Sequence, residues 1–193
     1  MNGLALKKAA LLKAYLVFLD ESGFLMAPLV RRSWAPRSHT PVLYQCTRSH
    51  KKVSVIAALC VSPAKDRVQM YFRLHPDANI NAACVVDFLK NLLRQLRRPI
   101  VLIWDRLQAH RKANNLVCNS SPIHSFFLPP YSPELNPVEN VWSYLKMNPM
   151  ANRNPLNIDD LVQTARHHGR SVQRKPHLLL SFLKHSPLIL RLK

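Results

Sequence analysis

The chain has 193 residues, of which 48% are hydrophobic, and 28 lysines and arginines outnumber 10 aspartates and glutamates to give a net charge of +18. This length indicates one domain with at most a tail, and the hydrophobic content excludes a globally disordered chain. A positive excess of this size is unlike a neutral metabolic enzyme and predicts a polyanionic partner, with nucleic acid the first candidate.

The cysteines and the N-terminal segment indicate a reducing, cytoplasmic compartment. The cysteines at positions 46, 60, 84 and 118 lack the close spacing of a zinc knuckle or redox motif, and a chain of this length needs no disulfides. Residues 6–19 place lysines before an apolar run, as a signal peptide does, but they lack a small-residue cleavage site and run directly into Asp20. We therefore predict a strand here, and no membrane helix, because no apolar run approaches the required ~18 residues.

Three strand-like segments open the sequence. Residues 15–19 form a short apolar run that ends at Asp20. Residues 53–61 and 68–74 are two further runs separated by a Ser-Pro turn, which is the pattern of a hairpin. Between the first and second runs, residues 28–41 are basic and contain several prolines, which indicates a loop or loose hairpin.

A helix, a strand and a second helix follow. Residues 79–98 carry apolar side chains at helical spacing, and Pro99 stops this pattern. Residues 100–104 are apolar throughout, as expected of a buried strand, and end at Asp105. The next predicted helix contains Ala109, Leu116 and Val117.

The last predicted strand, residues 123–128, precedes the clearest helix start in the sequence. Asn136 is a favourable N-cap and Pro137 a favourable first helical residue. The apolar stripe of this helix consists of Val138, Val141, Trp142 and Leu145. After it, the basic residues 152–193 are predicted to form one or two helices.

The order of these elements is three strands, helix, strand, helix, strand and helix. This order predicts an α/β fold with a central mixed five-stranded sheet flanked by helices. An antiparallel opening meander would lead into parallel crossovers.

Two aspartates stand out among the acidic residues because each ends a hydrophobic strand. Carboxylates at the carboxyl ends of buried strands in an open α/β sheet are placed for ligand binding. If the two strands are neighbours, Asp20 and Asp105 converge, and a divalent cation would relieve their repulsion. Aspartate oxygens favour Mg²⁺ or Mn²⁺. The alternative is that both side chains only cap the turns that follow them.

A third carboxylate could come from Glu134 or Glu139. Glu139 is the third residue after Asn136, and Asn-x-x-Glu is a capping-box pattern in which the glutamate returns to the N-cap backbone. Glu139 also flanks the apolar stripe, at the end of the helix nearest the strand tips, and could face the two aspartates. Glu134 lies in a proline-flanked turn with less fixed geometry.

Three motifs in this order resemble the catalytic domain of DDE transposases, with the bacterial insertion-sequence group of the mariner-type superfamily as the nearest branch. The motifs are LDESGF at 19–24, IWDRLQAHR at 103–111 and LPPYSPELNPVENVWSYLK at 128–146. Thirty-three residues separate Asp105 from Glu139, close to the spacing of the superfamily. RRSWAPRSHTP at 31–41 resembles the segment that this group carries after its first aspartate.

The resemblance implies an RNase H-like fold and a metal-dependent DNA endonuclease. Asp20, Asp105 and Glu139 would be the catalytic, metal-binding carboxylates, which favours Glu139 over Glu134. Two Mg²⁺ or Mn²⁺ ions would serve phosphodiester hydrolysis and strand transfer at the ends of an insertion sequence, as in DNA transposition and integration. No covalent protein nucleophile is needed.

Basic side chains beside these motifs are the candidate DNA contacts. A patch after the first strand contains Arg31, Arg32, Trp34 and Arg37, with an ordinary charged hairpin as the alternative. Around the acidic motifs, Arg106, Arg111 and Lys146 could contact the DNA backbone, and His110 could touch a phosphate or the attacking water.

The resemblance also implies partners and a division of the chain. We expect residues 1–14 to be a linker or remnant, residues 15–150 the catalytic domain, and residues 151–193 a basic helical extension. Family members carry an N-terminal helix-turn-helix region, which would here be encoded in another reading frame and joined by frameshifting, act as a separate chain, or be lost from a remnant copy. The expected assembly is a homodimer on paired DNA ends, in the bacterial cytoplasm with the nucleoid.

Two other functions compete with a transposase. The chain could be a DNA-binding remnant or regulator that keeps the fold but does not cut. It could also be another RNase H-like nuclease, which the PELNPVENVW segment disfavours because that segment resembles transposases in particular.

Overall fold

The computed structural model describes residues 2–27, 29–40, 42, 51–117 and 121–187. Cys46, Cys118 and the ends of the predicted 28–41 loop lie outside these residues, as does the end of the predicted C-terminal extension. Among the described residues, no helix is long and apolar enough to cross a membrane.

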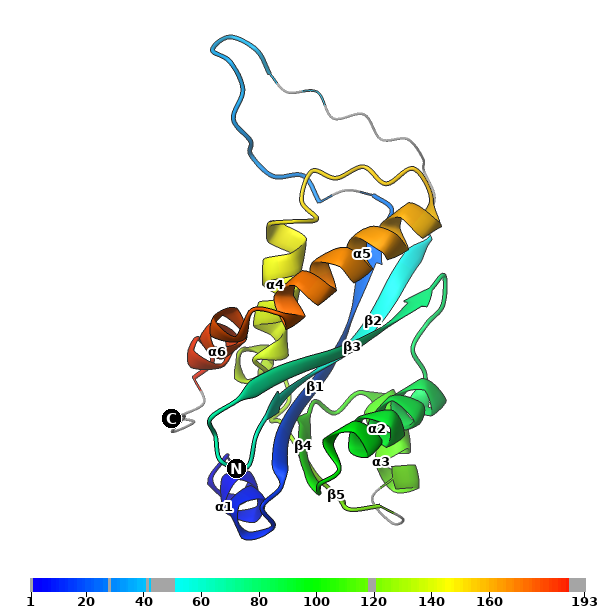
Figure 1. Cartoon of the computed structure of the whole chain (residues 1–193). Coiled ribbons are helices and arrows are strands. Elements are labelled where there is room, and N and C mark those ends of the chain that lie inside the picture. The colour runs from blue at the N-terminus through cyan, green and yellow to red at the C-terminus, as the bar shows by residue number, and fades with distance from the viewer. Residues whose placement is uncertain (1, 28, 41, 43–50, 118–120, 188–193) are drawn as a thin grey trace.

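A single sheet of five strands forms the centre of the fold, in the order β3-β2-β1-β4-β5 (Figure 1). β2 pairs antiparallel with both β1 and β3, whereas β4 runs parallel to both β1 and β5. The predicted mixed sheet is therefore confirmed. The strands are β1 (Tyr15–Leu25), β2 (Lys52–Val61), β3 (Val68–Pro76), β4 (Ile100–Trp104) and β5 (Ile123–Phe127).

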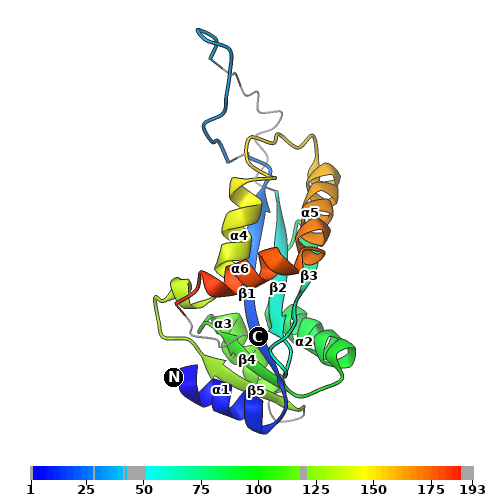
Figure 2. The same ribbon diagram turned by 60° about the vertical axis from the view of Figure 1, so that its left-hand side comes forward.

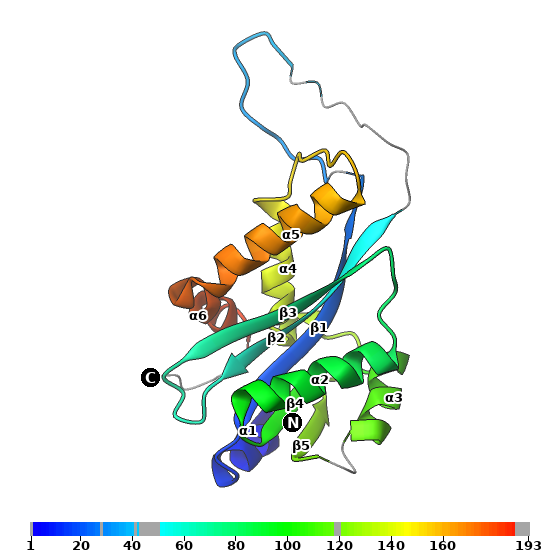
Figure 3. The ribbon, with the colours of Figure 1, turned by 45° about the vertical axis from the view of Figure 1, so that its right-hand side comes forward.

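Alternating side chains of the sheet build two hydrophobic cores, one on each face. Leu16 and Phe18 of β1 belong to one core, whereas Val17 and Leu19 belong to the other. Figures 2 and 3 show the two helical layers. The first face is covered by α1 (Asn2–Leu11), α4 (Val138–Met147), α5 (Ile158–Gln173) and α6 (Pro176–Lys184), and the second by α2 (Ala82–Leu96) and α3 (Gln108–Val117).

The N-terminal part of the chain differs from the sequence prediction. The strand predicted over residues 6–19 is wrong before Tyr15, because α1 occupies Asn2–Leu11. Alanine, leucine and lysine dominate this segment and favour a helix, and Ala5 and Ala9 are buried against the sheet. β1 also extends six residues beyond its predicted end, since its second half pairs with β2 as far as Leu25 opposite Lys52.

The helix ends follow local capping chemistry. The Asn81 side chain accepts a hydrogen bond from the Cys84 backbone N–H at 3.0 Å, so α2 begins later than the predicted residue 79. α4 begins at Val138, one residue after the predicted start. Asn136 still serves this end, because its Oδ1 accepts from the Val138 N–H at 3.3 Å while its Nδ2 donates to the Leu19 carbonyl at 3.0 Å. The start of α4 is thereby tied to β1.

Candidate active site

The sheet topology brings Asp20, Asp105 and Glu139 to one cleft. Phe18 of β1 lies opposite Ile103 of the parallel strand β4, so the two aspartates, each two residues further on, project from the same face of the sheet. Glu139 enters from the first turn of α4, which packs on that face. All three carboxylates line a cleft of about 530 Å³, together with Arg106 and Arg111. The predicted convergence of the three acidic motifs is therefore present in the fold.

Asp20 is the most buried carboxylate of the three, with 7% of its surface exposed. The indole N–H of Trp142 donates to its Oδ2 at 2.9 Å. Burial raises the pKa of Asp20 to about 7, and the negative charge of Glu139 adds to this rise, whereas the hydrogen bond from Trp142 opposes it. The cleft therefore holds more negative charge than its own hydrogen bonds compensate.

Asp105 is held from behind by a buried histidine. His110 Nδ1 lies 2.5 Å from Asp105 Oδ1, and the Leu107 backbone N–H donates to the same oxygen at 3.1 Å. Burial alone would raise the pKa of Asp105, but the hydrogen bonds from His110 and Leu107 outweigh it and lower this pKa. Asp105 is therefore ionised, and the two hydrogen bonds to Oδ1 fix the orientation of its carboxylate.

His110 itself bridges two carboxylates. Its Nε2 lies 2.8 Å from Glu21 Oε1, and its ring stacks on Trp104 with 4.6 Å between centroids. Burial opposes a charge on His110, but the bonds to Asp105 and Glu21 prevail and raise its pKa to about 9. Both ring nitrogens therefore carry protons at neutral pH and donate to carboxylates.

The predicted direct contact between His110 and DNA does not hold in this structure. The His110 side chain is fully buried, and both of its nitrogens face carboxylates. His110 does not line the cleft itself. It influences the cleft only by its hydrogen bond to Asp105.

Glu21 is the member of this group that sequence reasoning missed. As the next residue after Asp20 on β1, it projects to the opposite face of the sheet, where α3 lies. Its Oε2 is buried and has no hydrogen-bond partner among the described residues. The available signal was the acidic pair itself, because a carboxylate on the helix-covered face of a strand requires a partner.

Glu139 faces the aspartates rather than the cap of its own helix. The Asn136 backbone N–H donates to the Pro133 carbonyl at 2.8 Å, so the capping-box alternative for Glu139 is wrong. Burial raises the pKa of Glu139, Lys146 lowers it, and Asp105 raises it again. Glu134, in contrast, is exposed in the short helix η1 (Pro133–Leu135).

The charge and donor atoms of the cleft fit a hard divalent cation. Hydrogen bonds among the described residues engage Oδ2 of Asp20 and Oδ1 of Asp105, which leaves the second oxygen of each for a ligand. Carboxylate oxygens are the donors that Mg²⁺ and Mn²⁺ prefer. No three His, Cys, Asp or Glu side chains in the described ranges form a ready-made set of metal ligands, so the fit rests on donor type and uncompensated charge.

The predicted DNA-contacting residues fall into separate regions. Arg106 and Arg111 are exposed at the cleft, whereas Lys146 lies two turns beyond Glu139 on α4. Residues 29–40, here called the arm, form a loop that projects from the body (Figure 1). Every predicted contact on the arm is exposed, and these contacts stay predictions: Arg31, Arg32, Trp34 and Arg37.

Comparison with known proteins decides the family. Residues 15–162 match the family described as DDE superfamily endonuclease. This chain belongs to the DDE superfamily endonuclease family. An uncharacterized protein of Sinorhizobium fredii, y4pE/y4sA, is 58% identical in a match 85 residues long that covers 41% of this chain and 62% of that protein.

Solved structures of the Mos1 mariner transposase share the fold of this DDE endonuclease domain. The Mos1 paired end complex with Mn has a TM-score of 0.65 at 15% identity, over 96% of this chain and 57% of the Mos1 chain. The Mos1 strand transfer complex has a TM-score of 0.61 at 16% identity, over 96% and 58%. The predicted RNase H-like fold is thereby confirmed. The chain spans less than two thirds of the length of each of these relatives.

Proposed function

We propose that this DDE endonuclease domain is the catalytic part of a transposase, which cleaves DNA strands and transfers them at the ends of an insertion sequence. The observation that carries the proposal is the convergence of Asp20, Asp105 and Glu139 from three different elements on one cleft. Membership of the endonuclease family and the net charge of +18 support it.

The same three carboxylates would hold divalent cations, Mg²⁺ or Mn²⁺, with two ions per site. When bound, these ions supply activation of the attacking oxygen and stabilisation of the leaving oxygen in an in-line displacement at phosphorus. The chain's own residues orient the ligands: Trp142 donates to Asp20 and His110 donates to Asp105. Likeness to Mos1 complexes that contain Mn or Mg supports this part of the proposal.

The substrate would be DNA bound through its phosphates. Arg106 and Arg111 lie at the cleft beside Asp105 and would neutralise the backbone near the cut. Two copies of the chain would act together on paired ends, and the likeness to the Mos1 paired end complex supports this assembly.

Nicking of supercoiled plasmid tests the activity directly. The purified chain is incubated with plasmid at low salt in Mg²⁺ or Mn²⁺, beside Asp105→Asn. We expect relaxed, nicked plasmid with the unsubstituted chain alone, because the variant keeps the shape of residue 105 but loses the charge of its carboxylate.

Two controls make this result interpretable. Asp105→Asn should retain non-specific DNA binding and a cooperative thermal transition, since the basic surface is unchanged. If Asp105→Asn unfolded the protein, Asp105 would be structural. If the unsubstituted chain bound DNA but did not nick it in either metal, and still did not nick it after a separately encoded helix-turn-helix half was added, the non-cutting DNA-binding alternative would replace this proposal.

A further inference from the structure

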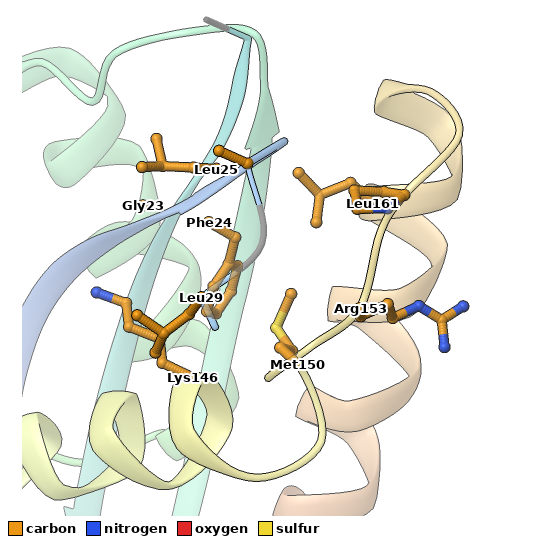
Figure 4. A pocket seen from close by; sticks show the side chains of 10 residues that line it. Gly23, Phe24, Leu25, Leu29, Lys146, Met150, Arg153 and Leu161 are labelled. Carbon is orange, nitrogen blue, oxygen red and sulfur yellow. The ribbon is translucent and has the colours of Figure 1, made fainter. Parts of the chain in front are cut away.

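A second pocket, of about 340 Å³, lies beyond the carboxylate cleft. It opens between the end of β1, Ala27, Leu29 at the start of the arm, and the segment between α4 and α5 (Figure 4). Its apolar lining includes Phe24, Leu25, Leu29, Met150 and Leu161. This volume is in the range of small-molecule sites rather than of packing defects.

Two elements connect the cleft to this pocket over the same distance. Gly23 of β1 lies three residues after Asp20, which is about 10 Å along a strand. Lys146 of α4 lies seven residues after Glu139, which is about 10.5 Å along a helix and on the same side. In B-form DNA, roughly three successive nucleotides of one strand span about 10 Å along the helix axis.

The chemistry of the pocket combines an apolar centre with a cationic rim. Leu25 and Leu29 are 58% and 46% exposed, which leaves apolar surface open to a ligand. Lys146 and Arg153 lie on either side, with their charged ends directed away from the apolar side chains (Figure 4). Asp160 lies 3.5 Å from Arg153, and Glu139 interacts electrostatically with Lys146, so both cations are partly compensated by carboxylates that do not line the pocket. A ligand complementary to this pocket would place a flat or compact apolar group at its centre and an anionic group at its cationic rim.

The segment beside the pocket is anchored in the structure. The Arg31 backbone N–H donates to Asn152 Oδ1 at 2.6 Å, and its guanidinium donates to the Met147 carbonyl at 2.7 Å. These bonds join the base of the arm to the end of α4. A third cation is thereby fixed next to the pocket.

We propose that this pocket receives one unstacked nucleobase of the bound DNA strand, two or three nucleotides from the phosphate in the carboxylate cleft. The inference rests on the proposed function, because DNA is taken as the substrate. The base would lie against Phe24, Leu29 and Met150, while its phosphates would face Lys146 and Arg153. Contact with the base face would be tolerant of sequence, since every base presents an apolar face.

Filling the pocket tests the proposal. Ala27 lines the pocket and is exposed, so Ala27→Phe occupies the site without entering the core. Ala64→Phe is the matched control: Ala64 is also exposed, but it lies in the turn after Val61, at the opposite end of β2 from Lys52 and its partner Leu25. The probes are a 12-nucleotide oligothymidine and a 12-nucleotide abasic strand with the same phosphates.

Affinities are measured by fluorescence polarisation at low salt without divalent ions. We expect Ala27→Phe to weaken oligothymidine binding by about tenfold, to leave abasic-strand binding unchanged, and Ala64→Phe to change neither. Equal weakening of both strands, or of neither, would overturn the proposal. So would a loss of self-association in Ala27→Phe with unchanged DNA affinity, because the occupant would then be a protein segment.

Photo-crosslinking identifies the contact independently. An oligothymidine with 5-iodouracil at each position is irradiated with the folded protein, and crosslinked peptides are mapped by mass spectrometry. Crosslinks to Phe24 or Met150 support the proposal, whereas crosslinks confined to Trp34 of the arm contradict it. Both assays need neither metal nor cleavage, so their outcome is separable from that of plasmid nicking.

Discussion

His110 shows how a residue outside the cleft can control a residue inside it. Its imidazole joins Asp105 to Glu21 and stacks on Trp104, so the direction of Asp105 is fixed from the opposite face of the sheet. In metal sites generally, a side chain that orients a ligand in this way raises the affinity for the ion, and this is the role that we propose for His110.

We expect His110→Gln to weaken binding of Mn²⁺ by about 10–100-fold, because Asp105 loses the partner that orients it. Electron paramagnetic resonance of free Mn²⁺ measures this affinity on folded protein. His124→Gln is the matched control, since His124 is half-buried on β5 and does not line the cleft. A variant that melts at a lower temperature but binds Mn²⁺ normally would show that His110 is only structural.

At the scale of elements, the packing of α5 on the sheet depends on the absence of a side chain. Gly169 lies in the C-terminal half of α5, and a Cβ atom there would come within 2.7 Å of the Phe72 ring on β3. A glycine inside a helix costs up to about 1 kcal/mol relative to alanine, so close contact between α5 and β3 outweighs helix propensity here.

Gly169→Ala is therefore expected to lower the free energy of unfolding by about 1–3 kcal/mol, although alanine is the better helix former. Gly3→Ala provides the same change in α1, where a Cβ atom meets nothing within 4 Å. That control should be neutral or stabilising by up to about 1 kcal/mol. Urea denaturation of both variants measures the difference, and a stabilised Gly169→Ala would contradict the packing described here.

For the whole molecule, the net charge of +18 favours a polyanionic partner, which we propose is DNA. Binding through phosphates releases counterions, so the logarithm of the affinity falls linearly with the logarithm of salt concentration. The slope of that line is proportional to the number of phosphates that the protein contacts, which the total charge of the chain does not reveal.

We expect the double variant Arg106→Gln, Arg111→Gln to reduce this slope by about two, because both side chains lie at the cleft. The double variant Arg94→Gln, Arg98→Gln removes the same charge from exposed positions at the end of α2 and just beyond it, and should leave the slope nearly unchanged. Filter binding or fluorescence polarisation between 50 and 200 mM salt measures both slopes. Over this range, two phosphate contacts change the affinity by about tenfold. Equal slopes for the two variants would show that DNA binding is not localised at the cleft.

The sequence by itself determined the order of elements from β1 to α4, because α2 carries apolar side chains at helical spacing and β4 is a short run that is apolar throughout. It was misleading for α1, where a short apolar run fitted strand and helix alike. It also ended β1 too early, because Ser22 and Gly23 are weak strand formers and only pairing with β2 extends the strand to Leu25.

The candidate site also has features that the sequence predicted and features that depend on the tertiary structure. Three motifs in order predicted Asp20, Asp105 and Glu139, since each lies at a recognisable end of an element. Only the tertiary structure decided that Glu139 faces the cleft, that Glu21 and His110 support Asp105 from the other face, and that a second pocket adjoins the site. These contacts join residues far apart in the chain, and their hydrogen bonds and burial exist only when the sheet and its two helical layers are assembled.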